Sequence, residues 1–135
     1  MTENELAQDL TRNQALVLDA LADAGAPLSA YSILDRLRGE GFRAPLQVYR
    51  ALDKLQEYGL VHRLESLNAF IVCSHPDCVP HDSIIFAICE QCGAVTEFAD
   101  KAMIRDVRKW ADAEHFHLTK SVIELRGTCR RCSAN

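Results

Sequence analysis

Two Cys-x-x-Cys pairs constrain the fold of this chain more than any other feature. Cys89 and Cys92, followed by Gly93, form the first pair, and Cys129 and Cys132 form the second, with 36 residues between them. Each pair can present two thiolates from one turn, because two intervening residues let the chain fold back. Four sulfurs around one ion make a closed tetrahedral zinc site. The pattern predicts structural zinc that clamps a strand-helix-strand subdomain.

Two other uses of these cysteines compete with zinc. A redox Cys-x-x-Cys usually occurs once, beside a strand-helix unit of the thioredoxin type, whereas here there are two pairs. Structural disulfides are typical of secreted proteins, and residues 1–14 are too polar and acidic for a secretion signal. Zinc is the favoured interpretation, and a four-sulfur site leaves no open position for catalysis.

The composition indicates an ordinary globular protein, expected in the cytoplasm. The 135 residues are 48% hydrophobic and 25% charged, and the chain has no run of about 18 apolar residues that would span a membrane. A net charge of −4 is unusual for a nucleic-acid-binding protein. Between Arg36 and Arg63, however, six basic residues stand against three acidic ones. That surplus suits a modest phosphate-binding patch.

Three short helices are predicted near the N-terminus. Apolar residues recur at helical spacing in residues 12–24, in a second stretch that begins after Ser29 and includes Tyr31, and in a third that begins at Pro45. Their expected start and stop signals are Thr11 and Ser29 as N-caps, Pro45 at the first position of the third helix, and Gly25, Gly39, Gly41 and Gly59 at the ends.

A hairpin is expected directly after the third helix. Residues 60–65 and 69–73 have the pattern of two strands joined by a short turn. A hairpin after a helix-turn-helix is the winged-helix arrangement, in which the third helix enters the major groove of DNA. Residues 1–73 are therefore predicted to be a winged-helix DNA-binding domain.

The outward face of the third helix supplies most of the candidate DNA contacts. Tyr and Arg near a helix N-terminus suit contacts with base edges and phosphates, arginine through two parallel hydrogen bonds to guanine. A solvated face with a half-buried tyrosine fits the same periodicity. The candidates on this helix and on the hairpin are Gln47, Tyr49, Arg50, Lys54 and Arg63.

Residues 74–83 are predicted to be a hinge, and residues 84–135 a second, small domain. Strands are expected at 84–88, 94–98 and 117–125, with a helix at 102–115 whose apolar positions include Trp110. Such a sheet with one helix buries little by itself, so zinc and a partner chain are expected to complete it. The expected fold class is α+β.

A second set of metal-ligand types surrounds the hinge. His62 and Cys73 lie on the hairpin, His81 lies in the hinge and Glu97 lies on a strand of the second domain. Nitrogen, sulfur and oxygen ligands from both domains can bind one ion and link domain orientation to metal occupancy. Four unrelated polar residues explain the same pattern. The possible substitutes are His75, Cys78 and Asp82, and a further pair, His115 and His117, would share a strand face.

No enzyme is predicted. The chain has no Gly-rich phosphate loop, no Gly-x-Ser-x-Gly and no His-Glu-x-x-His motif. A small-molecule substrate is therefore not expected.

Several local motifs together resemble the ferric uptake regulator family over nearly the whole chain. They are Val48-Tyr49-Arg50-Ala51-Leu52, Gly59-Leu60-Val61-His62, Cys-x-x-Cys-Gly at Cys89 and the final Cys-x-x-Cys. Within that family, Ser29-Ala30-Tyr31, Val61-His62-Arg63-Leu64-Glu65-Ser66 and Cys92-Gly93-Ala94-Val95 are most similar to the branch that controls zinc uptake.

The resemblance implies a homodimeric, zinc-dependent repressor that binds an operator in double-stranded DNA. It implies an N-terminal winged helix, a C-terminal dimerisation domain and about two zinc ions per monomer. Cys89, Cys92, Cys129 and Cys132 would hold structural zinc, whereas His62, Cys73, His81 and Glu97 would hold regulatory zinc. Tyr49 and Arg50 match the positions of the family's DNA-reading residues.

The sequence departs from the family pattern at three places. One is the His/Asp-rich tract before the first cysteine pair, which is reduced to His81-Asp82, so that His75 or Cys78 could replace His81 as a ligand. Gln47 stands where the family usually has Ser or Thr, and Lys120 and Ser121 stand where many members have a histidine. The missing histidine disfavours a third metal site. Two alternatives remain: a regulator of the same fold that senses iron, manganese or peroxide, and a zinc-ribbon interaction protein that does not bind DNA.

Overall fold

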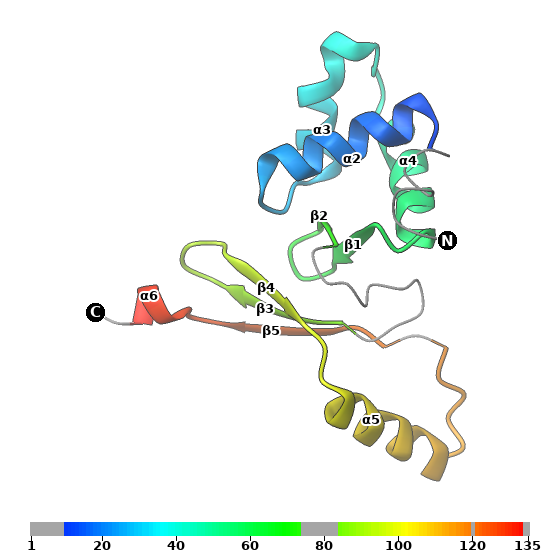
Figure 1. The fold of residues 1–135 in the computed structure, drawn as a ribbon, viewed down its shortest axis with the longest axis vertical. Coiled ribbons are helices and arrows are strands. Elements are labelled where there is room, and N and C mark those ends of the chain that lie inside the picture. Colours follow the sequence, from blue (N-terminus) through cyan, green and yellow to red (C-terminus); the bar gives the residue numbers. More distant parts are fainter. Residues whose placement is uncertain (1–9, 74–83, 120, 134–135) are drawn as a thin grey trace. The chain divides into compact units, whose positions relative to one another are not determined.

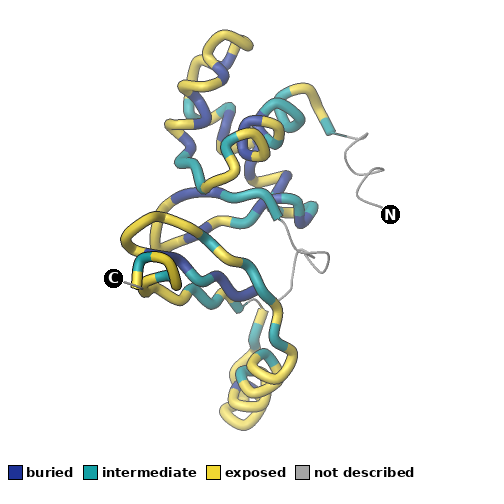
Figure 2. Tube along the Cα trace, turned by 60° about the vertical axis from the view of Figure 1, so that its left-hand side comes forward, coloured by how far each residue is buried: buried dark blue, intermediate teal, exposed yellow. Residues whose placement is uncertain are grey.

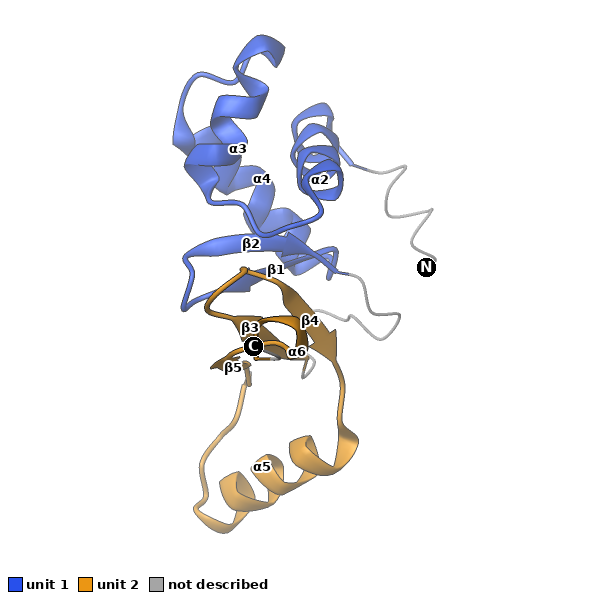
Figure 3. Cartoon of the chain, turned by 90° about the vertical axis from the view of Figure 1, so that its left-hand side faces the viewer, with its two compact units in different colours: residues 1–73 blue, residues 74–135 orange. Residues whose placement is uncertain are grey.

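The computed structural model describes residues 10–73, 84–119 and 121–133, and the chain divides into two compact units, residues 1–73 and 74–135 (Figures 1 and 3). The first unit contains helices α2 (Arg12–Ala24), α3 (Ala30–Leu37) and α4 (Pro45–Glu57), the 3-10 turn η1 (Arg38–Glu40), and strands β1 (Val61–Leu64) and β2 (Ala69–Val72). The second contains β3 (Ile85–Cys89), β4 (Val95–Phe98), α5 (Lys101–Ala113), β5 (Ile123–Gly127) and α6 (Arg130–Ser133). The predicted α+β class is confirmed.

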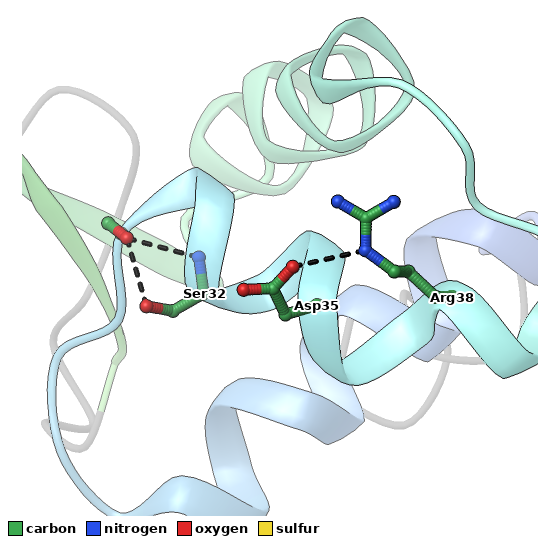
Figure 4. A network of polar contacts seen from close by, with 4 residues as sticks. Ser32, Asp35 and Arg38 are labelled. Atoms are coloured by element: carbon green, nitrogen blue, oxygen red, sulfur yellow. Dashed lines mark hydrogen bonds and ion pairs between the residues drawn. The ribbon is translucent and has the colours of Figure 1, made fainter.

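The helices of the first unit begin where the sequence predicts caps. The Thr11 hydroxyl accepts a hydrogen bond from the backbone N–H of Gln14, whose side chain accepts one from the Thr11 N–H, so both halves of a capping box are present. The Ser29 hydroxyl caps α3 by accepting from the N–H of Ser32 (Figure 4). Further along the chain, Asp35 of α3 pairs with Arg38, the first residue of η1, at 3.1 Å (Figure 4).

The core of the first unit lies between its three helices and the hairpin. The stripe of α4 formed by Val48, Ala51, Leu52 and Leu55 is buried, and β1 and β2 pair antiparallel with Val61 opposite Val72. Leu28 and Phe70 exchange backbone hydrogen bonds of 2.9 and 2.8 Å, which attach the α2–α3 connection to the hairpin. This is the winged-helix arrangement, and Figure 2 shows dark buried stretches along its helices.

The second unit is a three-stranded sheet with the order β4-β3-β5. β3 pairs antiparallel with β4 and parallel with β5, and α5 lies in the connection that returns the chain to β5. Only Ala111 of α5 is buried, whereas Trp110 is 59% exposed and forms a tilted aromatic pair with Phe116.

Three details of the sequence prediction are wrong. The last strand begins at Ile123 and not at His117, and His115 lies in a turn with a φ of 54°, so His115 and His117 do not share a strand face. Tyr31 is 63% exposed and does not belong to the buried stripe of α3.

None of the helices in the described ranges is both long and apolar enough to cross a bilayer.

Candidate metal centres and DNA-binding face

The parallel pairing of β3 with β5 brings the two Cys-x-x-Cys turns together. Cys89 ends β3 opposite Gly127, the last residue of β5. Because the two strands are parallel, the segments that follow them leave the sheet at the same end. Gly93, with a φ of 79°, turns the first segment back toward β4. In the second segment, α6 carries Cys132 back toward Cys129.

The four sulfurs are spaced as a zinc ion requires. All four Sγ atoms lie within 4.8 Å of one another, and those of Cys92 and Cys129 are 3.7 Å apart. A tetrahedron with zinc-sulfur bonds of about 2.3 Å has sulfur-sulfur edges of about 3.8 Å. A disulfide needs about 2.05 Å, and all four cysteines are free thiols. The geometry therefore fits a four-cysteine zinc site and disagrees with disulfides inside this cluster.

Backbone hydrogen bonds prepare one of these sulfurs for a metal. The N–H groups of Cys92 and Cys129 each approach the Sγ of Cys89 to 3.4 Å. These two bonds, that of Cys92 first, lower the pKa of the Cys89 thiol to about 6, despite the opposing effect of burial. A hydrogen bond from the Cys132 backbone likewise lowers the pKa of Cys129.

Cys132 titrates in the opposite direction. Its side-chain interaction with Cys129, followed by burial, raises its pKa to about 12. Several negative charges in one small volume repel one another, so four thiolates need a cation between them. A bound Zn²⁺ would supply that charge and displace the remaining protons.

Two of the four predicted regulatory ligands lie together in the first unit. A ring nitrogen of His62, on β1, and the Sγ of Cys73, just after β2, lie within 4.8 Å of each other. The Cys73 N–H donates to the Leu60 carbonyl at 2.9 Å, which fixes the end of the hairpin. The Cys73 sulfur takes part in a disulfide, so binding a metal there requires the reduced thiol.

The other predicted regulatory ligands belong to the second unit or fall outside the described residues. Glu97 is half-buried on β4 of the second unit, opposite Phe86. His81 and its possible substitutes His75, Cys78 and Asp82 lie outside the described residues.

The predicted DNA-contact residues lie on α4 and the hairpin. Arg50 is exposed, and Tyr49 is 36% exposed with its ring edge-on to that of Phe70 at 6.5 Å. Lys54 pairs with Glu57 at 3.2 Å on the same helix. A groove between this face and the first turn of α2 is lined by Thr11, Asn13, Gln14, Gln47, Arg50, Ala51, Asp53 and Lys54.

Gln47 has a structural role that its outward position did not predict. Its Oε1 accepts hydrogen bonds from the backbone N–H groups of Arg43 at 2.7 Å and Ala44 at 3.1 Å. It therefore supplies the N3 half of a capping box for α4, while Ala44 cannot supply the other half.

Asn68 lies in the turn that the sequence predicts between the two hairpin strands, but it was not among the predicted site residues, although it positions Arg63. Asn68 has a φ of 48°, and its Oδ1 accepts a hydrogen bond from Arg63 Nη2 at 3.2 Å. Asparagine tolerates a left-handed backbone better than most residues, and this preference in the turn is the signal that points to it. Arg63 also approaches Glu65 at 3.7 Å.

Known proteins resemble this chain over most of its length. The zinc uptake regulation protein of Escherichia coli K12 is 39% identical over 124 residues, which are 91% of this chain and 72% of that protein. A zinc uptake regulator solved in complex with zinc and DNA has a TM-score of 0.88 at 36% identity, over 98% of this chain and 90% of that one. The crystal structure of holo XcZur has a TM-score of 0.85 at 41% identity, over 93% of this chain and 87% of that one.

More distant structures share the fold. The Helicobacter pylori ferric uptake regulator has a TM-score of 0.61 at 19% identity, over 93% of this chain and 82% of that one. The model of the ferric uptake regulator family matches residues 8–126, which include both units. With its winged helix, its paired cysteine turns and this match, the chain belongs to the ferric uptake regulator family.

Proposed function

We propose that this protein is a zinc-responsive transcriptional repressor that binds operator DNA and controls zinc-uptake genes, with zinc as its co-repressor. The observation that carries the proposal is a similarity running through both units to a regulator solved with zinc and DNA. A relative named for zinc uptake regulation supports the same physiological role. Action on chromosomal DNA places the protein in the cytoplasm, and the proposal assigns it no catalytic activity.

Each subunit is proposed to bind two zinc ions with different roles. The four-cysteine site fills first and stabilises the second unit, because the free energy of binding a structural metal becomes folding free energy. The second ion is bound by His62, Cys73, His81 and Glu97. A thiolate and an imidazole in this set favour zinc over the harder ions manganese and magnesium.

The second ion would act by linking the two units. Since the proposed ligands come from both units, the affinity for zinc would depend on how the units are oriented. To take a mixture from 1:99 to 99:1, zinc must prefer the DNA-binding arrangement by roughly 10⁴-fold, about 5.5 kcal/mol. In a dimer, the two regulatory zinc ions together would supply this preference.

The protein is proposed to act as a homodimer through its second unit. That unit exposes the apolar side chains of Trp110, Phe116, Val122 and Leu125, and β5 lies at an edge of its sheet. Exposed edges and apolar patches favour association. Two subunits would present two α4 helices to the two halves of an operator.

The zinc content of the purified protein tests the two-site proposal. Under reducing conditions, the wild type should hold two zinc ions per monomer and Cys73→Ser should hold one, because that change removes a regulatory ligand only. Cys129→Ser is the matched variant for the structural site. An unchanged zinc content in Cys73→Ser would remove Cys73 from the proposal.

Operator binding tests the role of α4. Arg50→Ala should abolish zinc-dependent binding to the operator in a gel-shift assay and leave the zinc content unchanged. Arg105→Ala, which removes an exposed arginine of α5, should bind as the wild type does. If Arg50→Ala binds with wild-type affinity, α4 is not the recognition helix.

A metal titration separates the proposal from its alternatives. Operator binding should rise with Zn²⁺ at free concentrations where Fe²⁺ and Mn²⁺ have no effect. A response to iron or manganese alone would assign another signal to the same fold, and no binding with any metal would favour an interaction protein.

A further inference from the structure

The outward face of α4 begins with a large apolar residue. Leu46, the second residue of the helix, is 56% exposed. With Arg50 and Asp53 it follows the i, i+4, i+7 spacing of one helix face, and both of those residues are also exposed. The opposite face, with Val48, Leu52 and Leu55, is fully buried. Leu46 therefore lies on the part of α4 that a DNA groove would meet first.

The polar neighbour of Leu46 is already engaged within the protein. A glutamine reads adenine by accepting with its amide oxygen and donating with its amide nitrogen. The Oε1 of Gln47 is instead occupied by the backbone N–H groups of Arg43 and Ala44. Releasing it would leave two N–H groups without this partner at the start of the recognition helix. In the first turn of α4, Leu46 is therefore a large outward-facing side chain that is not held by hydrogen bonds to the backbone as Gln47 is.

From this arrangement we infer that Leu46 determines operator specificity by packing on the 5-methyl group of a thymine in the major groove. The inference rests on the proposed function and deepens it. The methyl group is the one apolar feature that a base pair presents in the major groove. In a helix-turn-helix, the N-terminal residues of the recognition helix are those that reach base edges.

Arg50 sets where the thymine lies. Residues four apart on a helix have Cβ atoms about 5–6 Å apart, and stacked bases are about 3.4 Å apart along a strand. The thymine read by Leu46 therefore lies within about two base pairs of the base or phosphate that Arg50 contacts. Each half-site of a symmetric operator would carry one such thymine.

Replacing thymine by uracil tests the inference, since it removes the methyl group and keeps every hydrogen-bonding group. The probe is a duplex selected by the wild-type protein from a random library in the presence of Zn²⁺, with each thymine of both half-sites replaced in turn. Replacement of the thymine that Leu46 contacts should weaken wild-type binding by about fourfold per half-site. Loss of one buried apolar carbon costs about 0.8 kcal/mol, which corresponds to that factor. In both half-sites the effect should reach about fifteenfold.

Two leucine variants make the test specific. Leu46→Ala should bind the thymine and uracil duplexes equally at that position, whereas Leu67→Ala, which removes another exposed leucine from the β1–β2 turn, should keep the wild-type preference. Leu46 is exposed and alanine favours helices, so the variant should fold; its zinc content and circular dichroism check this.

Three results would overturn the inference. In the first, the wild type binds every uracil-substituted duplex as tightly as the thymine duplex. In the second, Leu46→Ala loses as much affinity on uracil substitution as the wild type does, which would show that another group contacts the methyl. In both cases the proposed function stands, because the selected duplex is bound in a zinc-dependent way. If selection enriches no sequence with zinc, the proposed function fails and the inference fails with it.

Discussion

At the scale of single residues, the β1–β2 turn shows how a local backbone preference positions a charge. The left-handed backbone of Asn68 places its amide oxygen 3.2 Å from the Arg63 guanidinium. Arg63 still has other N–H donors available for a DNA phosphate, because a guanidinium carries five. The pair of Arg63 with Glu65 is exposed and contributes little to stability.

A phosphate contact by Arg63 predicts a change in the salt dependence of operator binding. In Arg63→Ala, the slope of log K against log salt should become shallower by about 0.9 per lost contact, or about 1.8 for a dimer with two hairpins. Asn68→Gly keeps the left-handed backbone and removes the amide, so it should weaken binding less. A slope in Arg63→Ala equal to that of Arg105→Ala would contradict this contact.

Phe42 is the largest fully buried side chain of the described residues, at 1% exposure, although it lies in the connection between η1 and α4. Phe42→Ala should lower the free energy of unfolding by about 3–5 kcal/mol, the usual cost of removing a buried phenyl ring. Urea denaturation followed by circular dichroism measures it. A loss below about 1 kcal/mol would mean that this connection does not form part of the core.

At the scale of elements, Gln47 serves the stability of α4. Gln47→Ala should reduce the free energy of unfolding by about 1 kcal/mol, the net value of a typical hydrogen bond. Gln47→Glu keeps an acceptor for the Arg43 and Ala44 N–H groups and should stay near the wild type. Equal stabilities of the two variants would show that the hydrogen bonds contribute nothing.

The elements that the sequence predicted best are those with local signals. Thr11, Ser29 and Pro45 mark helix starts by hydrogen bonding or ring geometry within one turn, and all three helices begin where these residues predict. The start of the last strand was predicted too early, because apolar residues also occur before Ile123. In the structure the strand begins where Ile123 pairs with Ile85 of β3. Strand register depends on such distant partners.

The candidate sites divide in the same way. The four-cysteine cluster was predictable because each Cys-x-x-Cys spacing encodes a turn. The parallel pairing of β3 and β5 then brings the two turns to the same end of the sheet. Phe42 was not predictable, since a buried loop residue follows no period. The hydrogen bonds of Gln47 to the preceding backbone could not be predicted either, because periodicity does not encode them. The DNA contact of Gln47 stays a prediction. The regulatory set remains a prediction, with His62 and Cys73 adjacent on the hairpin.

At the scale of the whole molecule, the two units should respond differently to loss of zinc. The first unit has a continuous apolar core of its own, whereas the buried apolar residues in the described part of the second unit are few and belong mainly to β3. Removing zinc with a chelator under reducing conditions should therefore unfold the second unit and leave the first folded.

Trp110, the single tryptophan of the chain, makes this difference measurable because it lies in the second unit. Chelation, or Cys132→Ser, should shift its emission and raise its mobility, while helical circular dichroism from the first unit persists. Cys73→Ser should keep the native emission, because it retains the four-cysteine site. Native emission in the fully metal-free protein would show that zinc does not hold this unit together.

The central claim is that zinc sets the arrangement of the protein and thereby its affinity for DNA. Operator affinity measured across a series of buffered free zinc concentrations, with the four-cysteine site already filled, tests it most directly. The account predicts that affinity rises through a saturable transition and that His62→Ala removes the rise while keeping the structural ion. Equal operator affinity at every free zinc concentration would contradict it.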